Sequence, residues 1–80
     1  MQIELKPKAE KDLKLLSSVY RSQVIEKLRW LEDHLRGDVK KLTNFTPEYR
    51  MRSGDYRVLF EVAKDTIVVY RILHRREVYR

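Results

Sequence analysis

The sequence contains no cysteine, only two glycines and two prolines, and two histidines, His34 and His74, that lie far apart. Without cysteine the chain can form neither a disulfide framework nor a thiolate metal site. The two histidines do not have the spacing of a metal-binding pair. The low glycine and proline content argues against long disordered linkers. We therefore expect no metal, no cofactor and no flexible connection between domains.

No stretch is apolar over a sufficient length to span a membrane, and the N-terminus shows no signal-peptide pattern. The sequence therefore predicts a cytoplasmic protein without membrane contact. Its 80 residues suffice for a single domain, residues 1–80. A chain of this size buries about 60% of the surface that it exposes when unfolded, which allows one small core.

Acidic side chains are in the minority: the sequence has 18 lysines and arginines but only 12 aspartates and glutamates, which gives a net charge of +6. Residues 49–80 carry eight of the cations and only four acidic side chains. Seven of these eight cations are arginine, whereas seven of the ten cations in residues 1–48 are lysine. Lysine is common on helix surfaces, but a basic arginine-rich segment points to nucleic acid, an acidic protein partner, or both.

The first part of the chain has the pattern of a short strand and two helices. Residues 2–5 alternate between polar and apolar, and Pro7 suits the first turn of a helix. Apolar residues recur at helical spacing on both sides of Ser17-Ser18: Ala9, Leu13 and Leu16 before it, and Tyr20, Val24, Leu28, Leu31 and Leu35 after it. Gly37 suits the end of the second helix. We expect an antiparallel helical hairpin that covers one face of a sheet.

A β-hairpin is predicted around Gly54-Asp55, which separates two alternating runs. With a two-residue loop, Ser53 lies opposite Tyr56 and Arg52 lies opposite Arg57. Opposed residues share a face and side chains alternate along each strand. One face then carries Tyr49, Met51, Ser53, Tyr56, Val58, Phe60 and Val62, and the other carries Arg50, Arg52 and Arg57.

The arginine face of this hairpin has two interpretations. Like charges opposite each other destabilise a sheet, and the planar donor fork of arginine suits phosphate, so the cluster indicates a site for an anion. The alternative is a solvated outer face whose charges serve solubility.

The second turn, near Lys64-Asp65, leaves the strand register open. A two-residue loop would place Arg71 on the apolar face, where an unpaired guanidinium is costly. A three-residue loop, residues 63–65, places Val68, Tyr70 and Ile72 on the apolar face and Arg71 opposite Arg57. We prefer the three-residue loop. The fold class is then α+β, with two N-terminal helices packed on a mainly antiparallel sheet of about four strands, and residues 39–45 link the two parts.

Two segments of the second half carry further motifs. The hairpin reads Tyr-Arg-Met-Arg-Ser-Gly-Asp-Tyr-Arg at residues 49–57, and the tail reads His-Arg-Arg-Glu-Val-Tyr-Arg at residues 74–80. Together with the helical hairpin, these segments resemble the RelE/ParE superfamily of bacterial and archaeal toxins, and within it the RelE-type mRNA interferases. The resemblance covers essentially the whole chain. It implies the toxin of a type II toxin–antitoxin system that cleaves mRNA in the ribosomal A site and is silenced by a cognate antitoxin.

The resemblance also implies roles for individual residues. It assigns catalysis to Arg57, Arg75 or Arg76, Tyr79 and His74, and RNA binding to basic positions at Arg50 and Arg52, to which we add Arg71, Lys40 and Lys41. The arginines suit the charge that builds up on the phosphoryl oxygens when the ribose 2′-OH attacks phosphorus. Tyr79 either transfers a proton or stacks on a base. Where the best-studied member of the family has a lysine that can act as general base, this chain has Arg50, which holds its proton too firmly for that role.

Two other functions compete with the nuclease. One is a ParE-like toxin that binds a protein target such as DNA gyrase and cleaves no RNA. The other is a non-catalytic module that binds RNA or the antitoxin. The clustered basic and phenolic residues favour the nuclease, because ParE-like relatives generally lack them.

Overall fold

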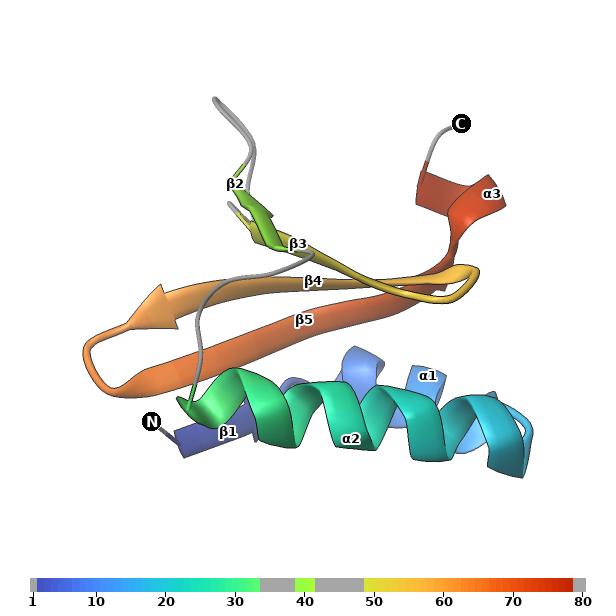
Figure 1. The fold of residues 1–80 in the computed structure, drawn as a ribbon, viewed down its shortest axis with the longest axis horizontal. Helices are drawn as coiled ribbons and strands as arrows, with labels where there is room; N and C mark the ends of the chain where they lie inside the picture. Colours follow the sequence, from blue (N-terminus) through green and yellow to red (C-terminus); the bar gives the residue numbers. More distant parts are fainter. Residues whose placement is uncertain (1, 34–38, 42–48, 79–80) are drawn as a thin grey trace.

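In the computed structural model, which describes residues 2–33, 39–41 and 49–78, a helical pair packs on a five-stranded sheet (Figure 1). The elements are β1 (Gln2–Leu5), α1 (Pro7–Leu15), α2 (Ser18–Asp33), β2 (Val39–Lys41), β3 (Tyr49–Ser53), β4 (Tyr56–Ala63), β5 (Thr66–His74) and α3 (Arg75–Val78). The strand order is β1-β5-β4-β3-β2. Only the β1–β5 pair among these strands is parallel. The predicted α+β fold is confirmed.

Strand β2 is an addition to the predicted sheet. The sequence interpretation treated residues 39–45 as a link, but residues 39–41 pair antiparallel with β3, with Val39 opposite Met51 and Lys41 opposite Tyr49. Three residues are too few to show an alternating pattern. Residues 39–41 form a strand because they pair with the edge of β3, whose backbone groups would otherwise lack partners.

The helical hairpin forms where the sequence predicts it. Pro7 occupies the first turn of α1, and Leu16 at its end has an extended backbone. The Arg21 guanidinium of α2 donates hydrogen bonds to the carbonyl oxygens of Leu13 (3.3 Å), Lys14 (3.1 Å) and Leu16 (2.8 Å). Carbonyls at the end of a helix lack the usual partner one turn further along. Arg21 therefore caps α1, beside the hydrogen bond from the Leu16 N–H to the Leu13 carbonyl at 3.2 Å, and holds the two helices together. No described helix is long and apolar enough to cross a membrane.

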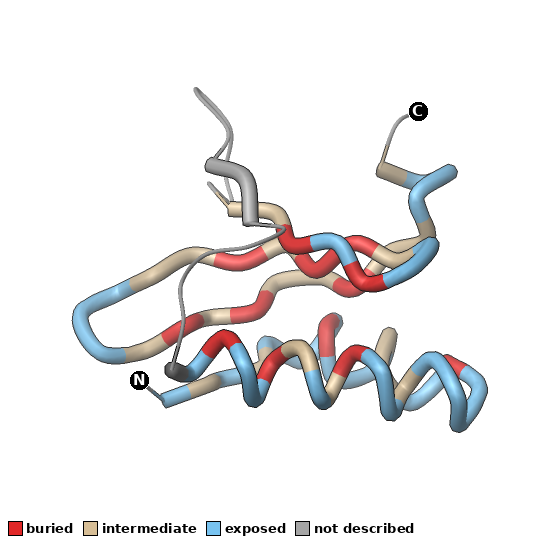
Figure 2. The backbone as a smooth tube through the Cα atoms, viewed as in Figure 1, coloured by how far each residue is buried: buried red, intermediate tan, exposed pale blue. Residues whose placement is uncertain are grey.

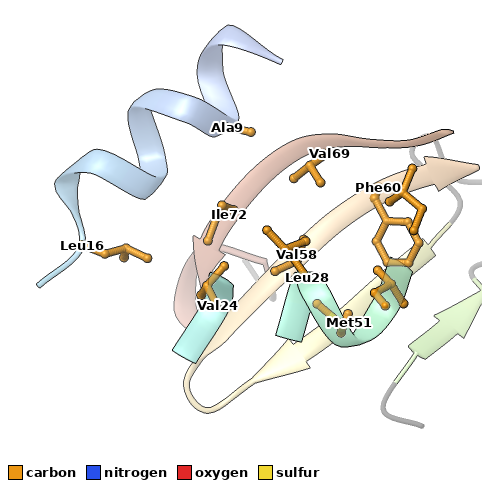
Figure 3. Close-up of a cluster of buried hydrophobic side chains, with 11 residues drawn as sticks. Ala9, Leu16, Val24, Leu28, Met51, Val58, Phe60, Val69 and Ile72 are labelled. Atoms are coloured by element: carbon orange, nitrogen blue, oxygen red, sulfur yellow. The ribbon is translucent and has the colours of Figure 1, made fainter. Parts of the chain in front are cut away.

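The core lies between the helical pair and one face of the sheet (Figures 2 and 3). Its buried side chains are Ala9 and Leu16 from α1 and its end, Val24, Leu28 and Leu31 from α2, and Met51, Val58, Phe60, Ile67, Val69 and Ile72 from the sheet. Figure 1 shows α1 and α2 on the same side of the sheet. We call the opposite side the outer face.

The first hairpin has the predicted register. Ser53 pairs with Tyr56, Arg52 with Arg57 and Met51 with Val58. Gly54 has a φ of +59°, in the left-handed region that favours glycine. Met51 and Val58 are buried under the helices, so alternation along the strands puts Arg52 and Arg57 on the outer face.

The second hairpin departs from the prediction, and the three-residue loop is wrong. Ala63 pairs with Thr66, so the loop is the two residues Lys64-Asp65. Phe60 then pairs with Val69, but Leu59 pairs with Arg71, which makes Tyr70 the extra residue of a β-bulge.

The bulge is the reason that the loop differs from the prediction. With uninterrupted alternation along β5, a two-residue loop would bury Arg71. The extra residue instead shifts the faces halfway along β5, so that Ile67, Val69 and Ile72 are all buried while Arg71 stays off the core face. Arg71 consequently lies opposite Leu59 and not opposite Arg57, and Val68 and Tyr70 are not core residues.

Candidate functional site

The arginine face begins at the tip of the first hairpin. Arg57 is only 8% exposed, and its Nη1 donates hydrogen bonds to the carbonyl oxygens of Gly54 (2.8 Å) and Tyr56 (2.9 Å). Arg52 is exposed on the neighbouring strand, directly opposite. The turn carbonyls therefore hold one guanidinium in place beside a second, exposed arginine, and charge-assisted hydrogen bonds of this kind are stronger than neutral ones.

Helix α3 brings two more arginines, Arg75 and Arg76, to the tip of the first hairpin. The backbone N–H of Arg75 donates to the carbonyl oxygen of Asp55 at 2.7 Å, which ties the start of α3 to the hairpin turn. Arg75 and Arg76 are both exposed. Elements that are far apart in sequence thus bring Arg52, Arg57, Arg75 and Arg76 to one end of the sheet, and we call these four residues the arginine cluster.

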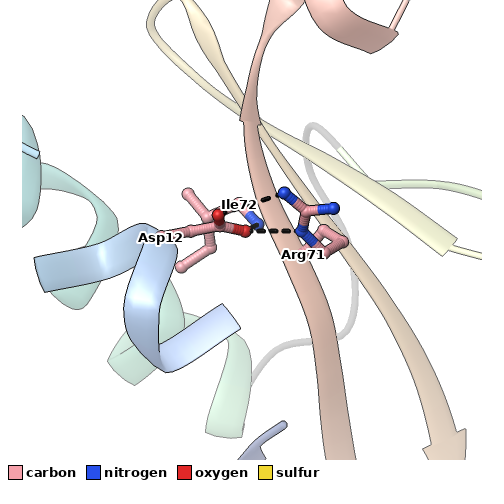
Figure 4. Close-up of polar contacts among 3 residues, drawn as sticks. All are labelled: Asp12, Arg71 and Ile72. Atoms are coloured by element: carbon pink, nitrogen blue, oxygen red, sulfur yellow. Dashed lines mark hydrogen bonds and ion pairs between the residues drawn. The ribbon is translucent and has the colours of Figure 1, made fainter. Parts of the chain in front are cut away.

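Arg71 has a different environment. Its Nε and Nη2 donate to the two carboxylate oxygens of Asp12 at 2.7 and 3.2 Å (Figure 4). The backbone N–H of Ile72 donates to the same carboxylate at 3.0 Å. The hydrogen bond to Asp12 raises the pKa of Arg71 further above its usual value. The structure therefore uses Arg71 to join β5 to α1.

His74 lies on the helix side of the sheet and not with the arginine cluster. It pairs with Tyr56, and the two rings meet edge to face with centroids 5.4 Å apart. Tyr56 in turn contacts Tyr20 of α2 at 5.3 Å. His74 Nδ1 accepts a hydrogen bond from the backbone N–H of Arg76 at 3.2 Å. The structure thus separates His74 from Arg57, which faces the other way.

The remaining predicted site residues are only partly described. Arg50 lies opposite Leu59 on β4 and opposite Lys40 on β2. The backbone of Lys40 and Lys41 belongs to β2. Tyr79 lies outside the described residues.

Asp12 was missed by the sequence interpretation although a signal was present. It lies three residues after Ala9 and four before Leu16, so it occupies the helix stripe that faces the core. A carboxylate at such a position predicts a partner, because an unpaired buried charge is costly. Beside it is a recess of about 260 Å³, lined among others by Leu15, His74 and Glu77.

The Asp12 carboxylate is expected to make stability dependent on pH. Burial raises its pKa, but the hydrogen bonds from Arg71 and Ile72 and the charge of Arg71 outweigh burial and lower the pKa below 3.8. A lowered pKa in the folded state stabilises the protein fully above the ordinary value, and this contribution is lost as the pH falls through the folded-state value. We expect the free energy of unfolding of the wild type to exceed that of Asp12→Asn by a constant amount near neutral pH. The difference should shrink below pH 3.8, which urea titrations of both proteins at several pH values would measure; a difference that grows on acidification would contradict the ion pair.

Comparison with known proteins connects this arrangement to a family. Residues 3–79 match the family model described as the ParE toxin of the type II toxin–antitoxin system parDE. A curated relative, Toxin RelE3 of Methanocaldococcus jannaschii, is 44% identical over 45 residues, which are 56% of this chain and 51% of the relative. The match thus spans about half the length of that protein.

Solved structures match over nearly the full length. The toxin of a RelB–RelE antitoxin–toxin complex from Methanococcus jannaschii is 30% identical, with a TM-score of 0.79 over 95% of this chain and 94% of that one. The isolated RelE toxin of E. coli is 26% identical, with a TM-score of 0.78 over 98% and 89% of the two chains.

Proposed function

The chain belongs to the ParE toxin family of type II toxin–antitoxin systems, and on this premise we propose that it is a RelE-type mRNA interferase. It would cleave mRNA in the ribosomal A site without a metal and thereby inhibit translation. The observation that carries the proposal is the arginine cluster: the backbone hydrogen bond from Arg75 N–H to the Asp55 carbonyl brings the start of α3, with Arg75 and Arg76, to the hairpin that carries Arg52 and Arg57. The similarity to the isolated RelE toxin of E. coli supports the same reading.

The proposed reaction needs little covalent participation by the protein. The ribose 2′-oxygen attacks the adjacent phosphorus and loses its proton, the bond from phosphorus to the 5′-oxygen breaks, and that oxygen takes up a proton. Negative charge develops on the phosphoryl oxygens during this exchange. Arg57 is held by the turn carbonyls, and a donor that is held in place before the reaction stabilises such charge. Arg75 and Arg76 are exposed on α3, whose first residue binds the same hairpin turn.

His74 faces the helices and packs on Tyr56, so we do not assign it a proton-transfer role. Tyr79 lies outside the described residues, and the resemblance to RelE-type toxins is the ground on which we propose it, either as a proton donor or as a platform on which a base stacks. Comparing Tyr79→Phe with Tyr79→Ala separates the two, because phenylalanine retains stacking and removes only the hydroxyl.

The RNA backbone would be held by basic residues of β2 and β3. We propose Arg50, Arg52, Lys40 and Lys41 for these contacts, which position the strand without reading its sequence. Arg71 is removed from this group because its guanidinium is bound to Asp12.

A cognate antitoxin is the proposed protein partner. Similar chains are found in complexes with antitoxins, as in the RelB–RelE complex of Methanococcus jannaschii. The net charge of +6 favours an acidic partner segment. We propose a cytoplasmic location for this toxin, because the proposed target, ribosome-bound mRNA, is found there.

The second candidate is a ParE-like toxin that acts on a protein such as DNA gyrase. It is favoured by one observation, the match of residues 3–79 to a family model named for ParE. The four residues of the arginine cluster favour the nuclease instead, because arginines at one end of the sheet suit a phosphate backbone.

A primer-extension map of mRNA in a reconstituted translation reaction tests the proposal. We expect cuts within codons when the toxin is added, and no cuts when ribosomes are omitted. Added antitoxin should suppress them. If translation runs normally and folded toxin produces no cuts, the nuclease is excluded, and a DNA supercoiling assay then tests the ParE-like function.

A further inference from the structure

Strand β5 extends beyond the strand that flanks it. The last register pair of β1 with β5 is Leu5 with Val69, followed by a hydrogen bond from Lys6 N–H to the Val69 carbonyl at 2.9 Å. β5 continues to His74. Over this final stretch β4 pairs with one edge of β5, while the other edge has no strand partner among the described residues. A backbone N–H on such an edge needs another acceptor.

Asp12 supplies that acceptor from helix α1. Its Oδ2 accepts the Ile72 N–H at 3.0 Å and the Arg71 Nε at 2.7 Å, and its Oδ1 accepts Arg71 Nη2 at 3.2 Å. Both oxygens of one side chain therefore bind two adjacent residues of β5 (Figure 4). The Asp12 side chain is 15% exposed, which protects these contacts from solvent competition.

Arg71 and Ile72, the two residues that Asp12 binds, lie shortly before Arg75 and Arg76 in the chain. His74 follows Ile72 by two residues, and Arg75 and Arg76 begin α3. On the other side, the Asp55 carbonyl holds the Arg75 N–H at 2.7 Å. On the α1 side, the recess of about 260 Å³ lies between Leu15 and Glu77, so side-chain packing does not fill that space. Apart from the packing of Ile72 in the core, the Asp12 carboxylate is the polar contact that joins this segment to α1 among the described residues.

We propose that Asp12 is a positioning residue that sets where residues 72–76 lie and thereby where Arg75 and Arg76 are presented. The importance of Asp12 for catalysis rests on the proposed nuclease function. The effect of Asp12 on the placement of residues 72–76 is independent of that function.

Hydrogen exchange measures the placement directly. The variant is Asp12→Asn, and the matched control is Glu10→Gln, which removes a carboxylate from the same helix that pairs only with exposed Lys14 at 3.7 Å among the described contacts. We expect exchange of the amides of residues 72–76 to accelerate about tenfold or more in Asp12→Asn, while the amides of β3 change by less than about twofold. Glu10→Gln should match the wild type. Acceleration spread evenly over the sheet, or no acceleration, would overturn the proposal.

Single-turnover cleavage on programmed ribosomes measures the catalytic consequence. We expect the maximal rate of Asp12→Asn to fall about ten- to a hundredfold, because small misplacements of catalytic groups have effects of this size. The toxin concentration for half-maximal rate should stay within about twofold of the wild type. The role of Asp12 in catalysis would be contradicted by a cleavage rate that falls only in proportion to the folded fraction. It would also be contradicted by an unchanged cleavage rate despite faster hydrogen exchange. If the wild type makes no cuts, the proposed function fails, and the exchange experiment still decides the placement.

Discussion

For the proposed nuclease, replacing Arg57 with alanine is expected to lower the rate of mRNA cleavage by about a hundredfold or more. Loss of one pre-positioned donor to a developing oxyanion typically costs about 10²–10³ in rate. Arg57 is the buried member of the arginine cluster, and the carbonyls of Gly54 and Tyr56 hold its Nη1. Little reorganisation is therefore needed when charge appears on the phosphate. Primer extension on ribosome-bound mRNA, followed over time, gives the rate.

The Arg57→Ala variant also removes two hydrogen bonds within the hairpin, so its folded fraction must be measured by circular dichroism in the same buffer. Arg57→Lys separates charge from geometry, because lysine keeps the positive charge but lacks the planar fork; we expect it to remain at least about tenfold slow. Arg29→Ala, an exposed arginine on α2, is the charge-matched control and should cleave at the wild-type rate. Normal cleavage by folded Arg57→Ala would remove this residue from the catalytic assignment.

The second large effect is on stability, where Phe60→Ala is expected to reduce the free energy of unfolding by about 3–5 kcal/mol. Phe60 is 0% exposed and stacks on Tyr49 with ring centroids 5.3 Å apart and an interplanar angle of 14°. It lies at the centre of the sheet, opposite Val69 on β5. Domains of this size have a total stability of about 4–12 kcal/mol, so much of the variant should be unfolded without a partner.

Urea denaturation of the isolated toxin measures this loss. Phe60→Leu retains most of the buried volume and is expected to lose less than half as much. Val19→Ala changes a side chain that is 62% exposed and should alter stability by less than about 0.5 kcal/mol. If Phe60→Ala unfolds at the same urea concentration as Val19→Ala, the core is not organised around Phe60.

Local patterns in the sequence were sufficient for most of the fold. The apolar stripe from Tyr20 to Leu31 specified the second helix, and Ser17-Ser18 separated it from the first, so that the two form a helical hairpin. Gly54-Asp55 specified both the turn and the register of the first hairpin, down to the pair Arg52–Arg57. These features succeed because helix periodicity, strand alternation and a glycine turn depend only on neighbouring residues.

Contacts between distant residues decided the rest. β2 forms only because the edge of β3 accepts it. The bulge at Tyr70 shifts the faces of β5 to suit a core that α1, α2, β3 and β4 complete. The spacing of residues within β5 does not predict this bulge. Its consequence is that Arg71 binds Asp12, a residue 59 positions earlier in the chain.

The candidate site divides in the same way. The sequence by itself determined which chemistry is available, because arginine density in residues 49–80 and a tight hairpin point to phosphate whatever the packing. Tertiary structure decided which of these groups can act together. It brought Arg75 to the turn at Asp55, turned His74 toward Tyr56, and committed Arg71 to an ion pair. The physical reason is that a side chain's type is local, whereas the face it occupies and the partner that holds it depend on where the rest of the chain packs.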